Sequence, residues 1–175
     1  TMHPFCRNTV AAMDWGGTIM NRYMSRDNKS RHRRYTSDVF EMAAAIVNQA
    51  SIQCIAMYPN NLSELPQHEI DFLKSVPTTW DETRFIDGYP GKYAVVARRH
   101  GDKWYVAALN GTNKPLSLNL SLPMLAGKQV TYHYETADKK SLWPKSDVKT
   151  TKVGKDGKLK IVMQPMGGNI VLGEA

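Results

Sequence analysis

The stretch "SVPTTWDETRFIDG", residues 75–88, lies between two parts of the chain that have different sequence patterns. Before Pro77 the apolar residues follow helical spacing, and after Thr78 they occur in short alternating runs typical of strands. The sequence therefore predicts an α+β protein, mainly helical over residues 1–75 and an antiparallel sandwich or open barrel over residues 76–175. A chain of 175 residues can bury such a core without disulfides or metals.

Two helices and a strand are predicted before this boundary. The segment "DVFEMAAAIVNQA" (38–50) places Asp38 at the N-cap and Glu41 three residues later, as in a capping box. The segment is apolar nearly all round, so it needs cover on several sides. "IQCIAM" (52–57) is predicted as a short buried strand, and a second helix is predicted to start near Pro66.

Eight short strands are predicted after the boundary, because β-rich runs alternate there with Gly, Asp, Asn and Pro. They are "TRFI" (83–86), "KYAVVARR" (92–99), "KWYVAALN" (103–110), "LSLNLSL" (116–122), "QVTYHYE" (129–135), "KTTKV" (149–153), "KLKIVM" (158–163) and "NIVLG" (169–173). "RRHGDKW" predicts a hairpin turn between the second and third runs. The alternation in "LSLNLSL" puts its four leucines on one face.

Asp81 and Glu82 resemble the acid and base of an enzyme but cannot act as such a pair. Neighbouring side chains of an extended segment point to opposite faces. The carboxyls of a glycosidase must instead converge on one bond, about 5 to 9.5 Å apart. The sequence favours a structural junction in which one carboxylate pairs with Arg84 and Trp80 packs between the two domains.

No metal site or disulfide framework is predicted. The five histidines lie far apart in the sequence without metal-binding spacing, and no phosphate-binding or nucleophile motif occurs. The two cysteines, Cys6 and Cys54, are favoured as buried free thiols, with a single bridge between them as the alternative.

A net charge of +7 raises the possibility of a nucleic-acid-binding basic domain. The most basic run, "SRDNKSRHRRY" (25–35), is not interleaved with stacking aromatics, so a solvated loop is the favoured interpretation. No apolar run approaches the roughly 20 residues that cross a bilayer. Neither nucleic acid nor membrane is expected as a partner.

Aromatic residues suggest two possible sugar contacts. "MDWGG" (13–17) combines an acid, a ring and two glycines, although a structural turn explains it equally well. A carbohydrate-binding module would need an exposed platform, and the candidates are Trp104, Tyr105, Tyr132, Tyr134 and Trp143. Strand parity separates Trp104 from Tyr105 and brings Tyr132 and Tyr134 to one face. Core packing is the favoured alternative, and a pure oligomerisation domain would instead show a contiguous apolar patch.

Two long segments carry a resemblance to glycoside hydrolase family 97. "HPFCRNTVAAMDW" (3–15) resembles a barrel segment of that family. "DFLKSVPTTWDETRFIDGYPGKYAVVARRHGDKWYVAALNG" (71–111) is similar to the entry into its C-terminal domain. The resemblance implies that residues 1–75 are the end of a (β/α)8 TIM barrel and that residues 76–175 are an all-β antiparallel sandwich.

The same resemblance implies a periplasmic or secreted bacterial enzyme that hydrolyses α-glucosidic or α-galactosidic bonds of oligosaccharides and depends on calcium. Its catalytic carboxyls and calcium ligands lie on barrel strands that would precede Thr1, so no catalytic residue and no metal ligand carries over to this chain. Arg7, Asp14 and Trp15 are the predicted substrate-binding residues. The family usually has Tyr-Thr-Pro-Gly after this Asp, and the different residues here put the sugar contacts in question.

The start "TMHPFCRNTV" leads us to expect a piece of a longer chain. We therefore expect the fragment to be inactive and to serve barrel closure, interdomain packing and homo-oligomerisation. Its partners would be the rest of the barrel and a second copy. The apolar helix around residues 43–47 is expected to be left uncovered without the rest of the barrel.

Overall fold

The computed structural model describes residues 1–25, 27 and 29–175. In these residues three short 3-10 turns, η1 (His3–Phe5), η2 (Arg7–Thr9) and η3 (Pro123–Leu125), accompany the helices and strands. The helices are α1 (Asp38–Val47), α2 (Asn61–Glu64) and α3 (Gln67–Ser75), and the strands are β1 (Trp15–Ile19), β2 (Gln53–Ala56), β3 (Glu82–Tyr89), β4 (Tyr93–His100), β5 (Lys103–Asn110), β6 (Leu116–Ser121), β7 (Gln129–Thr136), β8 (Lys145–Lys152), β9 (Lys158–Met163) and β10 (Gly168–Glu174). All eight strands predicted after residue 76 are present.

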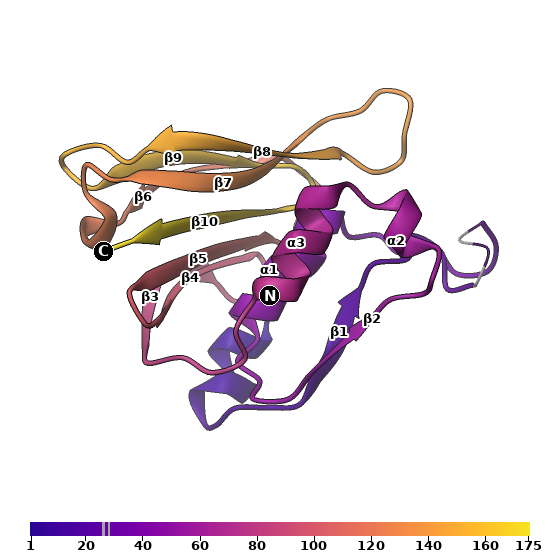
Figure 1. The fold of residues 1–175 in the computed structure, drawn as a ribbon, viewed down its shortest axis with the longest axis horizontal. Coiled ribbons are helices and arrows are strands. Elements are labelled where there is room, and N and C mark those ends of the chain that lie inside the picture. The colour runs from indigo at the N-terminus through magenta and orange to yellow at the C-terminus, as the bar shows by residue number, and fades with distance from the viewer. Residues whose placement is uncertain (26, 28) are drawn as a thin grey trace.

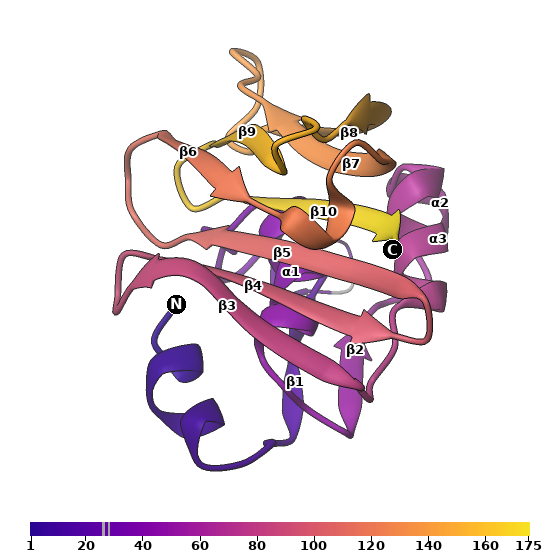
Figure 2. The ribbon, with the colours of Figure 1, turned by 90° about the vertical axis from the view of Figure 1, so that its left-hand side faces the viewer.

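A six-stranded antiparallel sheet forms the centre of the molecule, in the order β3, β4, β5, β10, β7, β8. A separate antiparallel pair, β6 and β9, lies in front of this sheet in Figure 2. Leu120 and Leu122 pack between the two layers against Trp104 and Val106. The predicted alternation of leucines therefore supplies one layer of a β-sandwich.

Helices α1 and α3 cover the opposite face of the central sheet (Figure 1). The apolar core there joins Val39, Met42 and Ile46 of α1 to Tyr105 and Ile170 of the sheet. Such packing explains why this helix has almost no polar face.

The prediction that the apolar α1 face is left uncovered is wrong. Ala43 through Val47 are at most 2% exposed in the single chain. The helix is covered by the central sheet on one side and by the β1–β2 layer and α3 on others.

The first 75 residues contain a parallel strand pair as well as helices. Strand β1 pairs with β2 in parallel, with Ile19 opposite Ala56, and α1 forms the connection between them. Parallel strands need a crossover of this kind, so the segment is a βαβ unit. The helix expected after Pro66 is present, and the strand expected at 52–57 is present as Gln53–Ala56. This strand is not buried as predicted, since Cys54 is exposed and the other three residues are half-buried. The strand at 15–19 was not predicted.

The predicted cap of α1 is wrong by one residue. Ser37 is the N-cap, and its hydroxyl accepts a hydrogen bond from the Phe40 amide at 3.0 Å. Asp38 lies inside the first turn, where its buried carboxylate pairs with Arg34. Arg34 is 8% exposed, so the 25–35 run is not wholly solvated; Arg26 and Asn28 of that run lie outside the described residues.

The prediction of buried thiols is also wrong. Cys6 and Cys54 are both free and exposed. Cys54 lies on the outer side of β2, because its neighbours Gln53 and Ile55 turn toward the protein. None of the helices among the described residues is both long and apolar enough to span a membrane.

Candidate functional site

The predicted substrate residues lie at the amino ends of β1 and β2. Arg7 and Asp14 line an open cavity of about 290 Å³ together with Ser51 and Ile52. The Trp15 indole donates instead to the Thr18 hydroxyl at 3.2 Å, along the strand. The Trp15 ring also meets the His3 ring edge-on at 5.8 Å and packs on the core around α1. The structure therefore brings Arg7 and Asp14 together, whereas the Trp15 side chain has a packing role.

The predicted junction residues surround the β4–β5 turn. Asp81 Oδ2 accepts a hydrogen bond from the Gly101 amide at 2.7 Å, and Glu82 Oε1 accepts one from Arg84 Nε at 2.6 Å. This hydrogen bond from Arg84 lowers the pKa of Glu82. The Trp80 ring meets the Tyr105 ring edge-on at 5.3 Å and packs on the core shared with α1. These contacts brace a turn. Both carboxylates also pair with the Arg99 guanidinium, Asp81 Oδ2 at 3.6 Å from Nη1 and Glu82 Oε2 at 3.4 Å from Nε, so they form a surface ion-pair cluster.

Four of the five aromatic candidates for a binding platform are buried. Trp104, Tyr105, Tyr132 and Trp143 are at most 7% exposed. Trp104 and Tyr105 belong to cores on opposite faces of the central sheet, as strand parity requires. Tyr132 and Tyr134 stack on each other with ring centroids 5.4 Å apart. Burial of these rings argues against a carbohydrate-binding module.

A cluster of buried acids joins the helices to the sheet, and the sequence pattern did not reveal it. Glu135 on β7 lies against the start of α1, where the Ser37 hydroxyl donates to its carboxyl group. Burial raises the pKa of Glu135 to about 8. The carboxyl is therefore neutral at neutral pH, and among the described residues its Oε2 has no hydrogen-bond partner.

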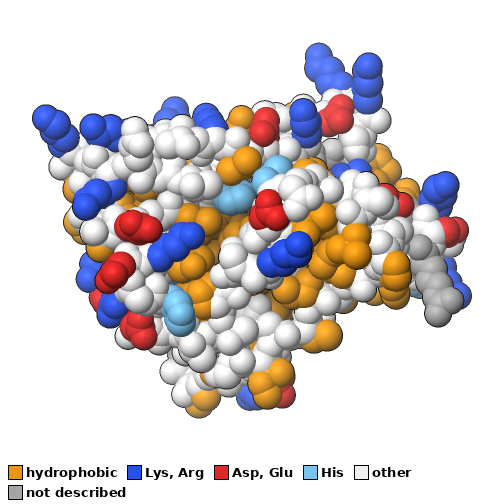
Figure 3. Space-filling model, in the orientation of Figure 1, with side chains coloured by type: hydrophobic (Ala, Val, Ile, Leu, Met, Phe, Trp, Pro, Cys, Tyr) orange, Lys and Arg blue, Asp and Glu red, His pale blue; other side chains and the backbone are white. Residues whose placement is uncertain are grey.

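A second acid in the same layer is Glu69 on α3, which accepts a hydrogen bond from the Ser146 hydroxyl of β8. Burial raises the pKa of Glu69 to about 7. The His68 and His133 rings lie beside it with centroids 5.6 Å apart. Burial lowers the pKa of His133 to about 4, so its ring is neutral. Two pale-blue histidine side chains lie close together near the middle of the face in Figure 3.

An ion pair completes this junction. The Asp38 carboxylate pairs with buried Arg34 and, at 3.1 Å, with Arg22. Among residues 1–25, 27 and 29–175, no group of three or more His, Cys, Asp or Glu residues could hold a metal ion. The role of the cluster is therefore structural. Two hydrogen bonds hold the start of α1 to β7 and α3 to β8, and the buried ion pair holds the start of α1 to the loop before it.

Sequence comparison decides the family. Residues 79–172 match the profile described as "Glycosyl-hydrolase 97 C-terminal, oligomerisation". The chain belongs to the glycoside hydrolase family 97 C-terminal domain family.

Relatives and solved structures agree with this assignment. The chain is 27% identical to a retaining alpha-galactosidase of Bacteroides thetaiotaomicron over 95% of its own length and 26% of the relative's. A solved beta-arabinopyranosidase is 46% identical with a TM-score of 0.90, over 98% of this chain and 26% of that one. A family 97 enzyme from Pseudoalteromonas sp. in complex with acarbose shares the fold at 23% identity and a TM-score of 0.78, over 99% of this chain and 28% of that one. The chain thus spans about a quarter of these relatives.

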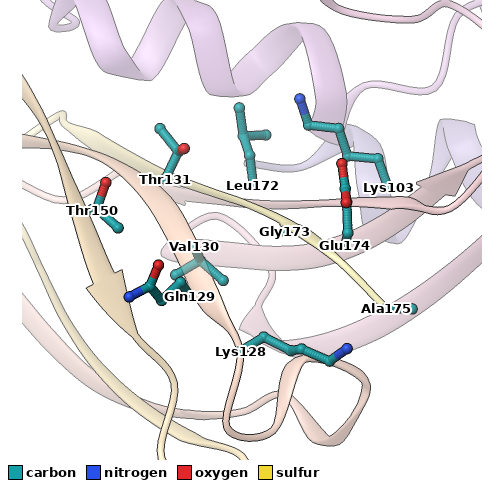
Figure 4. A pocket seen from close by; sticks show the side chains of 10 residues that line it. All are labelled: Lys103, Lys128, Gln129, Val130, Thr131, Thr150, Leu172, Gly173, Glu174 and Ala175. Atoms are coloured by element: carbon teal, nitrogen blue, oxygen red, sulfur yellow. The ribbon is translucent and has the colours of Figure 1, made fainter.

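One cavity of the family 97 C-terminal domain lies over the end of the central sheet (Figure 4). It is open, has a volume of about 490 Å³ and is lined by Lys103, Lys128, Gln129, Thr131, Thr150 and Glu174 among others. Glu174 is its one acidic side chain, whereas glycoside hydrolysis needs two carboxyls. This cavity therefore does not provide the catalytic pair.

Proposed function

We propose that this chain is the C-terminal portion of a glycoside hydrolase that acts on α-galactosidic or α-glucosidic bonds. Its own task is structural: it completes the catalytic barrel, fastens the barrel to the sandwich and contributes to oligomerisation. The observation that carries the proposal is that α1 belongs to the β1–α1–β2 unit and also packs on the central sheet of the family 97 domain. Helix α1 is therefore part of both the βαβ unit and the core of the family 97 domain.

In this proposal β1 and β2 are the last strands of a (β/α)8 barrel, and α1 and α3 are its last helices. The support is a parallel strand pair joined by a buried helix and followed by another helix, which is the repeating unit of such barrels. The catalytic carboxyls are then supplied by barrel strands outside this chain. Substrates of these barrels bind at the carboxyl ends of the strands. The barrel proposal therefore gives Arg7, Asp14 and Trp15 a supporting role at the opposite end.

The substrate class is proposed from the relatives. One is named a retaining alpha-galactosidase, and the more similar solved structure is named a beta-arabinopyranosidase. L-Arabinopyranose has the ring configuration of D-galactose without the exocyclic hydroxymethyl group, so both names are compatible with one ring shape. We favour pyranosides of this configuration over glucosides for the full-length enzyme.

Calcium dependence and a periplasmic or secreted location remain part of the proposal by resemblance. By the same resemblance, the calcium ligands are proposed to lie in the rest of the full-length protein.

Homo-oligomerisation is proposed because the family itself is described by that property. The two edges of the central sheet differ. Edge strand β8 carries Lys145, Lys149 and Lys152, which discourage edge-to-edge pairing, whereas edge strand β3 carries Phe85 and Tyr89 at 59% and 58% exposure. The β3 edge is therefore the better candidate for contact with a second copy.

Hydrolysis assays test the proposed function. The full-length protein and this chain are compared on p-nitrophenyl α-galactoside, α-glucoside and β-L-arabinopyranoside with calcium present. We expect hydrolysis by the full-length protein only, fastest on the galactoside or arabinoside. Hydrolysis by this chain would contradict the structural role, and an inactive full-length protein would contradict the glycosidase proposal.

A further inference from the structure

The loops that leave the carboxyl ends of β1 and β2 are tied together by asparagines. Asn21 follows β1, and its Oδ1 accepts hydrogen bonds from Asn61 Nδ2 at 2.6 Å and from Asn60 Nδ2 at 3.3 Å. Asn21 Nδ2 donates to the Ser25 carbonyl at 3.0 Å. Asn21 and Asn61 are fully buried, so this link is shielded from water.

The same link fixes the backbone of Tyr58, which lies two residues after the end of β2. Asn61 Oδ1 accepts a hydrogen bond from the Tyr58 amide at 2.8 Å. The Tyr58 side chain nevertheless remains 42% exposed. Its backbone is therefore held by a buried network while its ring is presented to solvent.

The Tyr58 ring lines an open cavity of about 630 Å³ between the two loops. The other lining residues are Met24, Ser25, Asp27, Ser30 and Arg31. Asp27 shapes this wall, because its carboxylate accepts hydrogen bonds from Ser25 Oγ at 2.5 Å, the Lys29 amide at 3.1 Å and Ser30 Oγ at 3.2 Å. Arg31 adds a guanidinium donor to the lining.

These features match the needs of a pyranose ring. An exposed aromatic face packs against the C–H face of a sugar, and nearby donors and acceptors bind its hydroxyls. The volume lies in the range of roughly 300 to 1,000 Å³ that holds small ligands. Other exposed rings, such as Tyr35 and Tyr89, do not line this cavity.

We propose that Tyr58 is a sugar-stacking residue that binds the leaving-group sugar of an oligosaccharide substrate. This inference rests on the proposed function, since it takes the carboxyl ends of β1 and β2 as the substrate side of a barrel. The cavity is open to solvent, which suits a second sugar ring better than the enclosed ring that is cleaved. Tyr58 thereby determines preference for long substrates over small aglycones.

The test uses the full-length protein and two substrates with the preferred glycosyl group: a disaccharide, which has a leaving-group sugar, and the methyl glycoside, which has none. We expect Tyr58→Ala to raise KM for the disaccharide about tenfold, the size of one aromatic contact, and to leave the methyl glycoside unchanged. Tyr58→Phe keeps the ring and should stay within about twofold of the wild type. Tyr35→Ala, another exposed tyrosine, is the matched control and should leave the KM for both substrates unchanged.

The outcomes separate the two proposals. Equal KM values for wild type and Tyr58→Ala on the disaccharide overturn the stacking role while leaving the glycosidase proposal intact. A parallel loss on both substrates, or a lower melting temperature for Tyr58→Ala than for Tyr35→Ala, shows a structural role instead. A wild-type protein that hydrolyses neither substrate overturns the proposed function and this inference with it.

Discussion

Burial changes how much an ion pair contributes to stability, as two pairs of side chains in this protein illustrate. Asp38 and Arg34 form a buried ion pair, with side-chain exposures of 2% and 6%. Glu82 and Arg84 form a pair of the same type at the surface, with exposures of 37% and 44%. Water screens the surface pair and not the buried one, so similar contacts differ in their contribution to stability.

Asp38→Ala is therefore expected to lower the free energy of unfolding by about 3 to 5 kcal/mol, because the Arg34 guanidinium stays buried without its carboxylate. Urea denaturation of the chain measures the loss. Arg84→Ala removes the exposed partner, whose guanidinium also lies over the Trp104 ring at 4.8 Å, and serves as the control. A loss of no more than about 1 kcal/mol is expected for it. Equal losses for the two variants would contradict the assignment of a buried ion pair.

Glu135 should make stability depend on pH. Its folded pKa of about 8 lies above the ordinary value of 4.5, so the folded protein binds a proton that the unfolded chain has released. The contribution of Glu135 to folding stability is fully present below the unfolded pKa and is lost as pH rises through the folded pKa. Glu69, with a pKa raised to about 7, acts in the same direction.

We expect unfolding free energy to fall by on the order of 2 kcal/mol between about pH 6.5 and about pH 8, a window above the ordinary histidine pKa. Glu135→Gln keeps the shape and removes the titration, so its profile should be flatter. Urea denaturation across this pH window provides the measurement. A variant with the same slope as the wild type would show that Glu135 is already ionised in the folded protein.

Among the secondary-structure elements, α1 packs closely on the central sheet at its first turn. Its first turn passes over the start of β10 at Gly168. A Cβ at Gly168 would lie 2.9 Å from the Val39 carbonyl oxygen and 3.0 Å from Phe40 Cα, which is too close for either atom. The absence of a side chain on this glycine lets helix and sheet share one core.

Gly168→Ala should therefore destabilise the chain by about 1 to 3 kcal/mol, the usual range for overpacking. Gly16→Ala is the matched control, because the nearest atom to its Cβ would be Cys54 Cβ at 3.9 Å, an ordinary contact. Thermal melting of both variants checks the difference. A neutral Gly168→Ala would show that α1 can shift away from β10 without loss.

For the whole molecule, the two segments predicted from sequence share a core across their boundary. The helix-facing side of the sheet buries Val96, Tyr105, Leu109 and Ile170 under α1 and α3. Removing residues 1–76 would expose this face to water.

A chain of residues 77–175 should consequently self-associate and bind a hydrophobic dye, whereas the 175-residue chain should unfold in one transition. Size-exclusion chromatography, dye fluorescence and calorimetry provide the measurements. A soluble monomer of residues 77–175 with a cooperative transition would contradict the shared core.

Local periodicity accounts for what could be predicted from sequence. The eight strands, the turn at Gly101, the one-sided leucines of β6 and the pairing faces of Tyr132 and Tyr134 all follow from the alternation of side chains along a strand. The family resemblance rested on contiguous words of sequence, and the match over residues 79–172 confirms it.

The contacts between the helices and the sheet could be found only from the tertiary structure. Ser37 and Glu135 are 98 positions apart, and Glu69 and Ser146 are 77 apart, so no spacing rule could pair them. The local sequence pattern predicted Asp38 as the N-cap of α1. In the structure its carboxylate pairs with Arg34 instead. Three other features likewise depend on which layers pack together. They are the burial of α1, the exposure of Cys54 and the position of Tyr58 beside the loop after β1. Secondary structure depends on neighbours in sequence, whereas burial and charge depend on neighbours in space.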